Sequence, residues 1–338
     1  MSEGAVYVQT NEPQNAVVVF RRGADGALTR AETYETGGAG DNRPHLTSQG
    51  SVTLTGDGGH LLVTNAASDD VTVFAVGDAG DLVALGRTPA GAAPKSVAEH
   101  AGAVYVLATG TPAVNGFRLT DGGLEAMDGG DHALAAGADP AQVGFSGDGS
   151  AVLVTERGTD SIVSFPAGAD GALGAGQTIA SSGPTPYGFA CTSDGTLVVT
   201  EAFRAHKGAA AASSYRLDGA TVTPATRSAG NGRSEICWAV VTPDGAYAFT
   251  TNFADGAVSR YSIGADGALT LDDAAAGVTV DGRPGLRDEA LSAGGDYLYA
   301  IDADAGSIFG WSVGAGGELS PIGSWDGLPA TVAGLAAT

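Results

Sequence analysis

The sequence predicts an all-β protein: a seven-bladed β-propeller with four-stranded antiparallel blades, closed by the C-terminal strand pairing with the N-terminal blade. Three observations predict this fold. First, the segments between turns alternate apolar and β-branched residues with polar ones, and no segment has a sustained helical period. Second, the chain starts part-way through a repeat and ends with the missing piece. Third, a glycine-centred turn recurs six times, 44 to 50 residues apart, at Gly58, Gly102, Gly149, Gly195, Gly245 and Gly295.

Each repeat is expected to form four strands, called a, b, c and d in chain order. The pattern is clearest in Ser51–Leu85 and Trp238–Leu271, which both read as strand a, tight turn, strand b, loop, strand c, tight turn and strand d. Asp-Gly pairs supply the positive φ that tight hairpin turns require. The six turns therefore mark six complete blades.

The two ends of the chain together complete a seventh blade. Ala5–Thr10, Ala16–Arg21 and Ala27–Tyr34 read as strands b, c and d, and no strand a precedes them. Ala330–Ala337 can supply that strand, which removes an exposed sheet edge at each end of the ring. We therefore expect a single domain over residues 1–338.

The composition excludes several classes of function. The chain has 16 basic and 38 acidic side chains, a net charge of −22, and 43% hydrophobic residues, which is enough for a sizeable core. A surface this acidic repels phosphate backbones and anionic lipids, so we expect no nucleic-acid or membrane partner. No export signal, no apolar run long enough to cross a bilayer and no cysteine framework is visible. We expect a cytoplasmic protein that is a monomer or a weak dimer.

Alternating strand directions sort the connections onto two faces of the ring. The a–b and c–d turns lie on one, the turn face, and the b–c loops and d–a crossovers lie on the other, the loop face. The loop face has the longer and more varied segments, so we expect the function there. Basic side chains on this face could form a binding site for a carboxylate or phosphate, with which arginine pairs well. Alternatively, they could form solvated ion pairs between blades. Eight of the sixteen basic residues map to this face: Arg43, Lys95, Arg157, Arg204, Lys207, Arg233, Arg283 and Arg287.

Two positions of the repeat are expected to face the central channel. The residue that ends strand b and the residues that open strand a recur with polar or aromatic side chains, among them Glu156, Glu201, Gln142, Tyr187, Trp238 and Arg287. Glu156 and Glu201 could form a general acid/base pair if burial raises one pKa, or each could cap its own loop. Tyr187 and Trp238 could pack in the channel or stack on a planar ligand. No metal-binding or nucleotide-binding motif is present, so neither a metal nor another cofactor is expected.

Several segments carry a family resemblance over essentially the whole chain. SDDVTVFAV, DPAQVGFSGDG, SSGPTPYGFACTSDG, CWAVVTPDGAYAFTTN and GLPATVAGLAA resemble the lactonase family of seven-bladed propellers, which includes bacterial 6-phosphogluconolactonases and fungal carboxy-muconate cyclases. The resemblance implies metal-free acid/base chemistry on a carboxylated or phosphorylated lactone, or on its ring-opened acid. It places Glu201 where the cyclases have a channel glutamate. Ala141 and Tyr187 stand where those enzymes have His and Arg.

The expected function is that of a cofactor-independent lactonase-like hydrolase or cycloisomerase (cyclase), acting on a small anionic, carboxylated metabolite in the central channel. Glu201 is the expected acid/base, with His45 or Tyr187 as proton-transfer partner. The expected substrate contacts are Arg43, Lys95, Gln142, Glu156, Arg204, His206, Trp238, Arg283 and Arg287. The alternative is a non-catalytic propeller that binds a small ligand or a protein on the same face.

Overall fold

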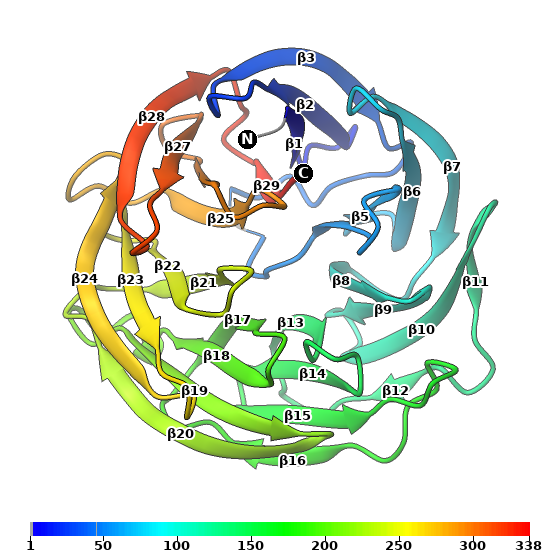
Figure 1. The fold of residues 1–338 in the computed structure, drawn as a ribbon. Coiled ribbons are helices and arrows are strands. Elements are labelled where there is room, and N and C mark those ends of the chain that lie inside the picture. The colour runs from blue at the N-terminus through cyan, green and yellow to red at the C-terminus, as the bar shows by residue number, and fades with distance from the viewer. Residues whose placement is uncertain (1–2, 45) are drawn as a thin grey trace.

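The computed structural model describes residues 3–44 and 46–338 and forms a seven-bladed β-propeller (Figure 1). The fold class expected from the sequence is confirmed. Blade 1 combines both ends of the chain, and the strands of blades 1 to 3 are β29 (Ala333–Ala337), β1 (Gly4–Gln9), β2 (Ala16–Arg22) and β3 (Leu28–Glu35); β4 (Val52–Leu54), β5 (His60–Asn65), β6 (Asp70–Val76) and β7 (Leu82–Pro89); and β8 (Pro94–His100), β9 (Ala103–Ala108), β10 (Ala113–Thr120), β11 (Gly123–Ala126) and β12 (His132–Ala133).

The remaining blades each have four strands, which follow one another from the axis outward. Only one short 3₁₀ turn, η1 (Phe203–Ala205), interrupts the described part of the chain. The strands of blades 4 to 7 are β13 (Pro140–Phe145), β14 (Ala151–Glu156), β15 (Ser161–Pro166) and β16 (Gln177–Ala180); β17 (Pro186–Cys191), β18 (Thr196–Glu201), β19 (Ala211–Asp218) and β20 (Thr221–Gly230); β21 (Ile236–Val241), β22 (Tyr247–Asn252), β23 (Ala257–Ile263) and β24 (Leu269–Val278); and β25 (Leu286–Leu291), β26 (Tyr297–Asp302), β27 (Ser307–Val313) and β28 (Leu319–Asp326).

The ring closes through the two ends of the chain, as expected. β1 pairs antiparallel with β29, with Val8 opposite Leu335, and the Ala5 amide donates to Thr338 Oγ1 at 2.7 Å. Alternate residues of β1 pack in opposite directions because blades stack on both faces of this sheet: Val6 and Val8 meet blade 7, whereas Ala5 and Tyr7 meet blade 2. Burial on both faces explains why the inner strands are apolar almost throughout.

The six predicted a–b turns are confirmed by their backbone geometry. The glycine of each turn has a φ between +70° and +85°, a region that residues with a Cβ rarely adopt. A Ser or Thr side chain two residues before the glycine's preceding Asp often donates a hydrogen bond to that Asp. In one such turn, Thr55 Oγ1 donates to Asp57 Oδ1 at 2.6 Å. These turns are therefore fixed locally, which is why the sequence reveals them.

Blade 3 departs from the four-strand pattern at its outer edge. Its outermost position is shared by β11 and the two-residue β12, which both pair with β10. The chain between β11 and β12 contains Gly129 and Gly130, and Gly130 packs so closely on Gly116 of β10 that a Cβ would lie 3.0 Å from it. The crossover to blade 4 therefore begins with an extra turn.

The crossover from β3 to β4 enters the middle of the ring, where Figure 1 shows it as the blue chain near the centre. The side-chain amide of Gln49 donates from Nε2 to Ala239 O at 2.8 Å and accepts at Oε1 from Ala239 N at 3.0 Å. The backbone N–H of Gln49 donates to Ala141 O. Trp238 Nε1 donates to Ser48 O at 3.1 Å. Blade 2 is thus joined across the axis to blades 4 and 6.

A cavity of about 340 Å³ lies on the turn-face side of this crossing segment. It is lined by the turn-face halves of several inner strands, and Gln49, Gln142 and Asp288 border it. In the described ranges, no helix is both long and apolar enough to cross a membrane.

Candidate functional site

Inner strands β17, β21 and β25 bring aromatic and charged side chains together near their loop-face ends. The rings of Tyr187 and Trp238 are 5.6 Å apart, and Arg157 Cζ lies 4.9 Å from the centroid of the Tyr187 ring. Arg287 Cζ lies 5.7 Å from the centroid of the Phe253 ring. We call Arg157, Tyr187, Trp238, Arg287 and Asp288 the axial cluster.

An irregular backbone at the start of each of these strands sets the directions of the side chains in the axial cluster. The pairing with strand b shifts register between Pro186 and Phe189, and between Leu286 and Glu289. Such bulges turn successive side chains away from strict alternation. The residue just before the strand also has a positive φ, as in Thr185 at +59°. Consecutive residues such as Arg287 and Asp288 are thereby both held near the axis.

Arg287 is a buried cation whose hydrogen-bonding capacity is only partly used. Its side chain is 3% exposed, and Nη2 lies 4.0 Å from Asp304 Oδ1. Nε and Nη1 have no hydrogen-bond partner among the described residues. Burial lowers the pKa of Arg287, and the carboxylate of Asp304 opposes that shift. Unpaired buried donors are unfavourable, and a carboxylate or phosphate could accept two parallel hydrogen bonds from such a group.

Asp288 is the carboxylic acid of the axial cluster. Burial raises its pKa to about 7, against the opposing effects of the Gly334 N–H, which donates to Oδ2 at 3.0 Å, and of Arg287. A carboxyl group with a pKa near neutrality is suited to exchange protons during catalysis. Asp288 also borders the turn-face cavity.

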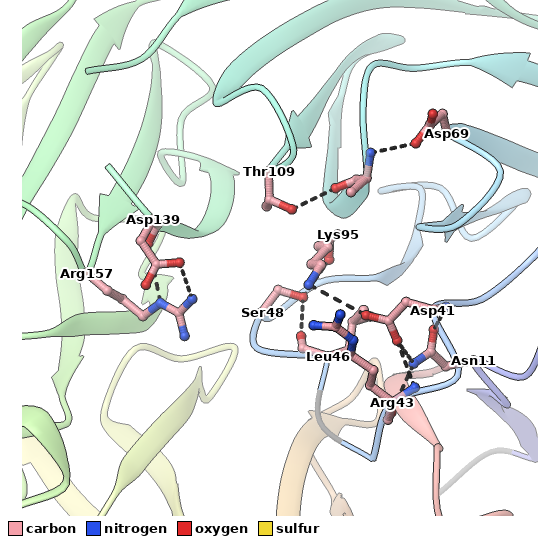
Figure 2. Close-up of polar contacts among 11 residues, drawn as sticks. Asn11, Asp41, Arg43, Leu46, Ser48, Asp69, Lys95, Thr109, Asp139 and Arg157 are labelled. Atoms are coloured by element: carbon pink, nitrogen blue, oxygen red, sulfur yellow. Dashed lines mark hydrogen bonds and ion pairs between the residues drawn. The ribbon is translucent and has the colours of Figure 1, made fainter. Parts of the chain in front are cut away.

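Lys95 and Arg43 form a second basic group on the loop face. Lys95 Nζ lies 3.6 Å from Asp41 Oδ2, and Asp41 Oδ1 accepts hydrogen bonds from Asn11 Nδ2 and from the Arg43 backbone. The Arg43 side chain is exposed. Figure 2 shows this group beside Ser48, with Arg157 and its partner Asp139, 2.7 Å apart, on the opposite side of the view. The predicted anion contacts Lys95 and Arg43 therefore lie on the loop face, outside the axial cluster.

The expected placement of Glu201 in the channel is wrong. Its side chain is fully buried and directed toward β19 and β20, away from the axis, and it accepts hydrogen bonds from Gly183 N, Ser213 Oγ and Ser228 Oγ at 2.6 to 2.7 Å. Burial raises the pKa of Glu201 and these donors oppose the shift. The recurring polar residue at the end of strand b therefore holds a blade together.

Glu156 does not pair with Glu201 either. Its Oε2 accepts a hydrogen bond from Thr159 Oγ1 at 2.5 Å, in the loop that follows its own strand, and one from Ser161 Oγ at 3.0 Å, at the start of β15. The side chain is therefore held within blade 4, as the loop-capping alternative implied, and it does not face the axis.

The other predicted contacts separate into buried and exposed groups. Gln142 and Trp238 are buried at the axis, where the Gln142 amide exchanges hydrogen bonds with the Phe189 backbone at 2.6 and 3.0 Å. Arg204, His206 and Arg283 are exposed on the loop face, and Arg204 pairs with Asp160. The structure does not bring these three to the axial cluster. His45 lies outside the described residues.

Sequence reasoning placed Arg157 among the basic residues of the loop face, but it assigned neither Arg157 nor Asp288 to the site. A signal for Asp288 was present: Arg287, Asp288 and Glu289 are three consecutive charged residues within a strand that is otherwise apolar. No comparable signal marked Arg157, which reaches Tyr187 from the neighbouring blade. Within the described part of the chain, no three His, Cys, Asp or Glu side chains are arranged to hold a metal ion.

Glu289 replaces an apolar residue of the repeat, which leads to a stability prediction. The corresponding residues are Val143 and Phe189, each paired like Glu289 with the residue two before the end of strand b. Both carboxyl oxygens of Glu289 are buried without a hydrogen-bond partner among the described residues. Burial first, and then the charge of Asp288, raise the pKa of Glu289 well above its usual value.

Glu289→Gln is expected to increase the free energy of unfolding by about 2 kcal/mol at pH 8 and by little at pH 5. The pKa of Glu289 is higher in the folded than in the unfolded chain. The folded state therefore loses stability as pH rises above the unfolded value, and glutamine removes this loss. Urea unfolding at both pH values measures the difference. An equal change at pH 5 and pH 8 would contradict this explanation.

Comparisons with known proteins identify first the class and then the family to which this fold belongs. The family model described as "Lactonase, 7-bladed beta-propeller" matches residues 2–115 and 111–204, more than half of the sequence. This chain belongs to the lactonase family of seven-bladed β-propellers. A comparison with curated proteins finds no match.

Solved structures share the whole fold at low sequence identity. A proposed 6-phosphogluconolactonase from Bacteroides fragilis is 20% identical, with a TM-score of 0.74 over 100% of this chain and 98% of that chain. The periplasmic gluconolactonase PpgL of Pseudomonas aeruginosa is 17% identical, with a TM-score of 0.71 over 98% and 99%. A protein from Lactobacillus plantarum is 14% identical, with a TM-score of 0.78 over 100% of both chains. The cytoplasmic location expected for this chain stays a prediction.

Proposed function

We propose that this protein hydrolyses a small anionic lactone at the axial cluster. The observation that carries the proposal is Arg287, a buried guanidinium whose Nε and Nη1 have no hydrogen-bond partner among the described residues, directly followed by Asp288, a carboxyl group with a pKa of about 7. An anion-binding group and a proton-accepting group are the two parts that such a reaction needs. Membership of the lactonase family, and relatives described as gluconolactonases, support the same reaction.

The members of the axial cluster have distinct roles in this proposal. Arg287, together with Arg157, which packs on Tyr187, holds the carboxylate or phosphate of the substrate. Asp288 takes a proton from water as the water oxygen attacks the lactone carbonyl carbon. The bond from that carbon to the ring oxygen then breaks, and the ring oxygen takes up a proton, giving a hydroxy acid. Burial raises the pKa of Tyr187 well above its usual value, so its phenol stays protonated and can donate to the developing oxyanion.

Access from two sides favours hydrolysis over ring closure. Asp288 borders the turn-face cavity, which gives water a route to the carboxylate from the side opposite the loop face. Lys95 and Arg43 lie on the loop face, where they attract an anionic substrate in a protein of net charge −22. The B. fragilis and P. aeruginosa relatives are described as lactonases and not as cyclases.

The test is a lactone panel that contains 6-phosphoglucono-δ-lactone, neutral glucono-δ-lactone and a carboxylated γ-lactone. Acid release is followed with a pH indicator, with subtraction of spontaneous opening. We expect turnover, with a higher kcat/KM for the anionic members than for the neutral one. Panel members that bind without being opened by the wild-type protein would favour the binding alternative, and a preference for the neutral lactone would contradict the role of Arg287.

A further inference from the structure

A second cavity of about 380 Å³ lies between blades 3 and 4, away from the axis. Its lining includes Glu156 at the end of β14, His132 of β12, and Val163, Phe165 and Thr178 of β15 and β16. The volume falls in the range of small-molecule sites. The proposed lactonase chemistry uses none of these residues.

Comparison of blades 4 and 5 shows that Glu156 lacks the donors that satisfy its counterpart. Glu201 ends strand b of blade 5 and accepts hydrogen bonds from Ser213 of β19 and Ser228 of β20. Ser213 pairs with the residue two before Glu201, and in blade 4 the equivalent position is Val163, opposite Val154. An apolar side chain therefore lies where blade 5 provides a hydroxyl group.

The crossover that precedes blade 4 also provides no donor. In other blades this segment reaches the end of strand b: Thr36 Oγ1 bonds Asn65, Asn231 Nδ2 bonds Asn252, and Thr279 Oγ1 bonds Asp302, each at 2.7 to 2.8 Å. Before blade 4, residues 133–138 are Ala, Leu, Ala, Ala, Gly and Ala. None of these has a polar side chain, and the cavity occupies the space.

Two residues that line this cavity each have a buried polar atom without a partner among the described residues. Glu156 is 1% exposed, and its Oε1 has no hydrogen-bond partner in the described ranges, whereas Oε2 is bonded. His132 Nε2 is likewise buried and unpartnered, and its ring packs 5.3 Å from that of Phe165. Leaving such atoms unpaired is unfavourable, so a ligand that bonds them would gain affinity.

The chemistry of the lining defines the ligand. Glu156 and the exposed Asp131 make the cavity acidic, and Phe165, Val163 and Leu134 supply an apolar wall. Among the described residues, no three side chains here meet the requirements of a metal site, so an organic cation fits better. We infer that this cavity binds a small primary ammonium compound, whose N–H groups donate to Glu156 and whose hydrocarbon part packs on Phe165.

The test uses n-butylammonium as the probe, with n-butanol and butyrate as the uncharged and anionic analogues at constant ionic strength. Binding to the full chain is measured by calorimetry and by NMR shift changes at His132 and Thr178. We expect saturable binding of n-butylammonium and much weaker binding of both analogues. Binding of n-butanol equal to that of n-butylammonium, or shift changes elsewhere only, would overturn the inference.

Variants locate the site without relying on any enzymatic activity. Glu156→Gln retains the size of the side chain and its bonds to Thr159 and Ser161, and should weaken n-butylammonium binding at least tenfold. Ala135→Trp, at the exposed lining of the cavity, should block binding and leave Glu156 in place. The matched control is Glu125→Gln, an exposed glutamate on β11, which should bind like the wild type. Unchanged binding in Glu156→Gln and Ala135→Trp would overturn the inference.

Discussion

Replacing Asp288 with asparagine is expected to reduce kcat for lactone opening at least about 100-fold, with a small change in KM. General base catalysis contributes about 10²- to 10⁴-fold, and an amide cannot take the proton from water. Asparagine retains an oxygen that can accept the hydrogen bond from the Gly334 N–H, so the fold should be preserved. Steady-state kinetics on the most rapidly opened lactone of the panel measures the loss.

The pH dependence of the same reaction identifies the group. The ionised carboxylate is the active form, so kcat/KM of the wild type should rise with pH through an apparent pKa of about 7. That step should be absent in Asp288→Asn. The matched control is Asp218→Asn, at the exposed end of β19, which should behave like the wild type. Full activity of Asp288→Asn with an unchanged pH profile would exclude Asp288 as the base.

Arg287→Ala is expected to lower kcat/KM for anionic lactones by about 100-fold, which corresponds to about 2.7 kcal/mol. This is the size expected when charge-assisted hydrogen bonds to a substrate anion are lost. Arg287→Lys should recover only part of the activity because an ammonium group cannot donate two parallel hydrogen bonds in the same plane. Kinetics with both variants measures these effects.

Neutral lactones supply the internal control for Arg287. Glucono-δ-lactone carries no anion, so its kcat/KM should fall much less in Arg287→Ala than that of an anionic lactone. Added guanidinium chloride at low concentration should partly restore turnover of anionic lactones. Arg227→Ala, an exposed arginine on the outermost strand of blade 5, should match the wild type. Equal losses for neutral and anionic substrates would indicate that Arg287 acts only on the fold.

The repeats of the fold could be predicted because they depend on local chemistry. Turn glycines such as Gly58 and Gly245 have backbone angles that few other residues adopt, and the segments between them include short runs rich in β-branched residues, such as β14. The crossing of the axis by Ser48 and Gln49 could not be predicted. Their partners lie 190 residues away, and no local pattern records that proximity.

The sequence pointed to charged residues near the loop face but could not tell which of them face the axis, as Glu201 and Arg287 illustrate. Both lie near the loop face at recurring positions, and charge alone does not separate them. The direction of each side chain depends on a bulge at the start of strand a and on donors from other segments, such as Gly183 for Glu201. These contacts are formed only when the blades assemble.

The hydrogen bonds of Gln49 have a consequence for folding. They connect the segment that enters blade 2 with blades 4 and 6 across the central axis. We therefore expect them to form late in folding, after blades 4 and 6 have taken their places in the ring. The ring of blades closes where β29 pairs with β1. The centre of the ring closes where the side-chain amide of Gln49 bonds Ala239 of β21. The assembled ring is therefore held closed at two separate places. The contacts of Gln49 form only when blades 2, 4 and 6 are in their final positions.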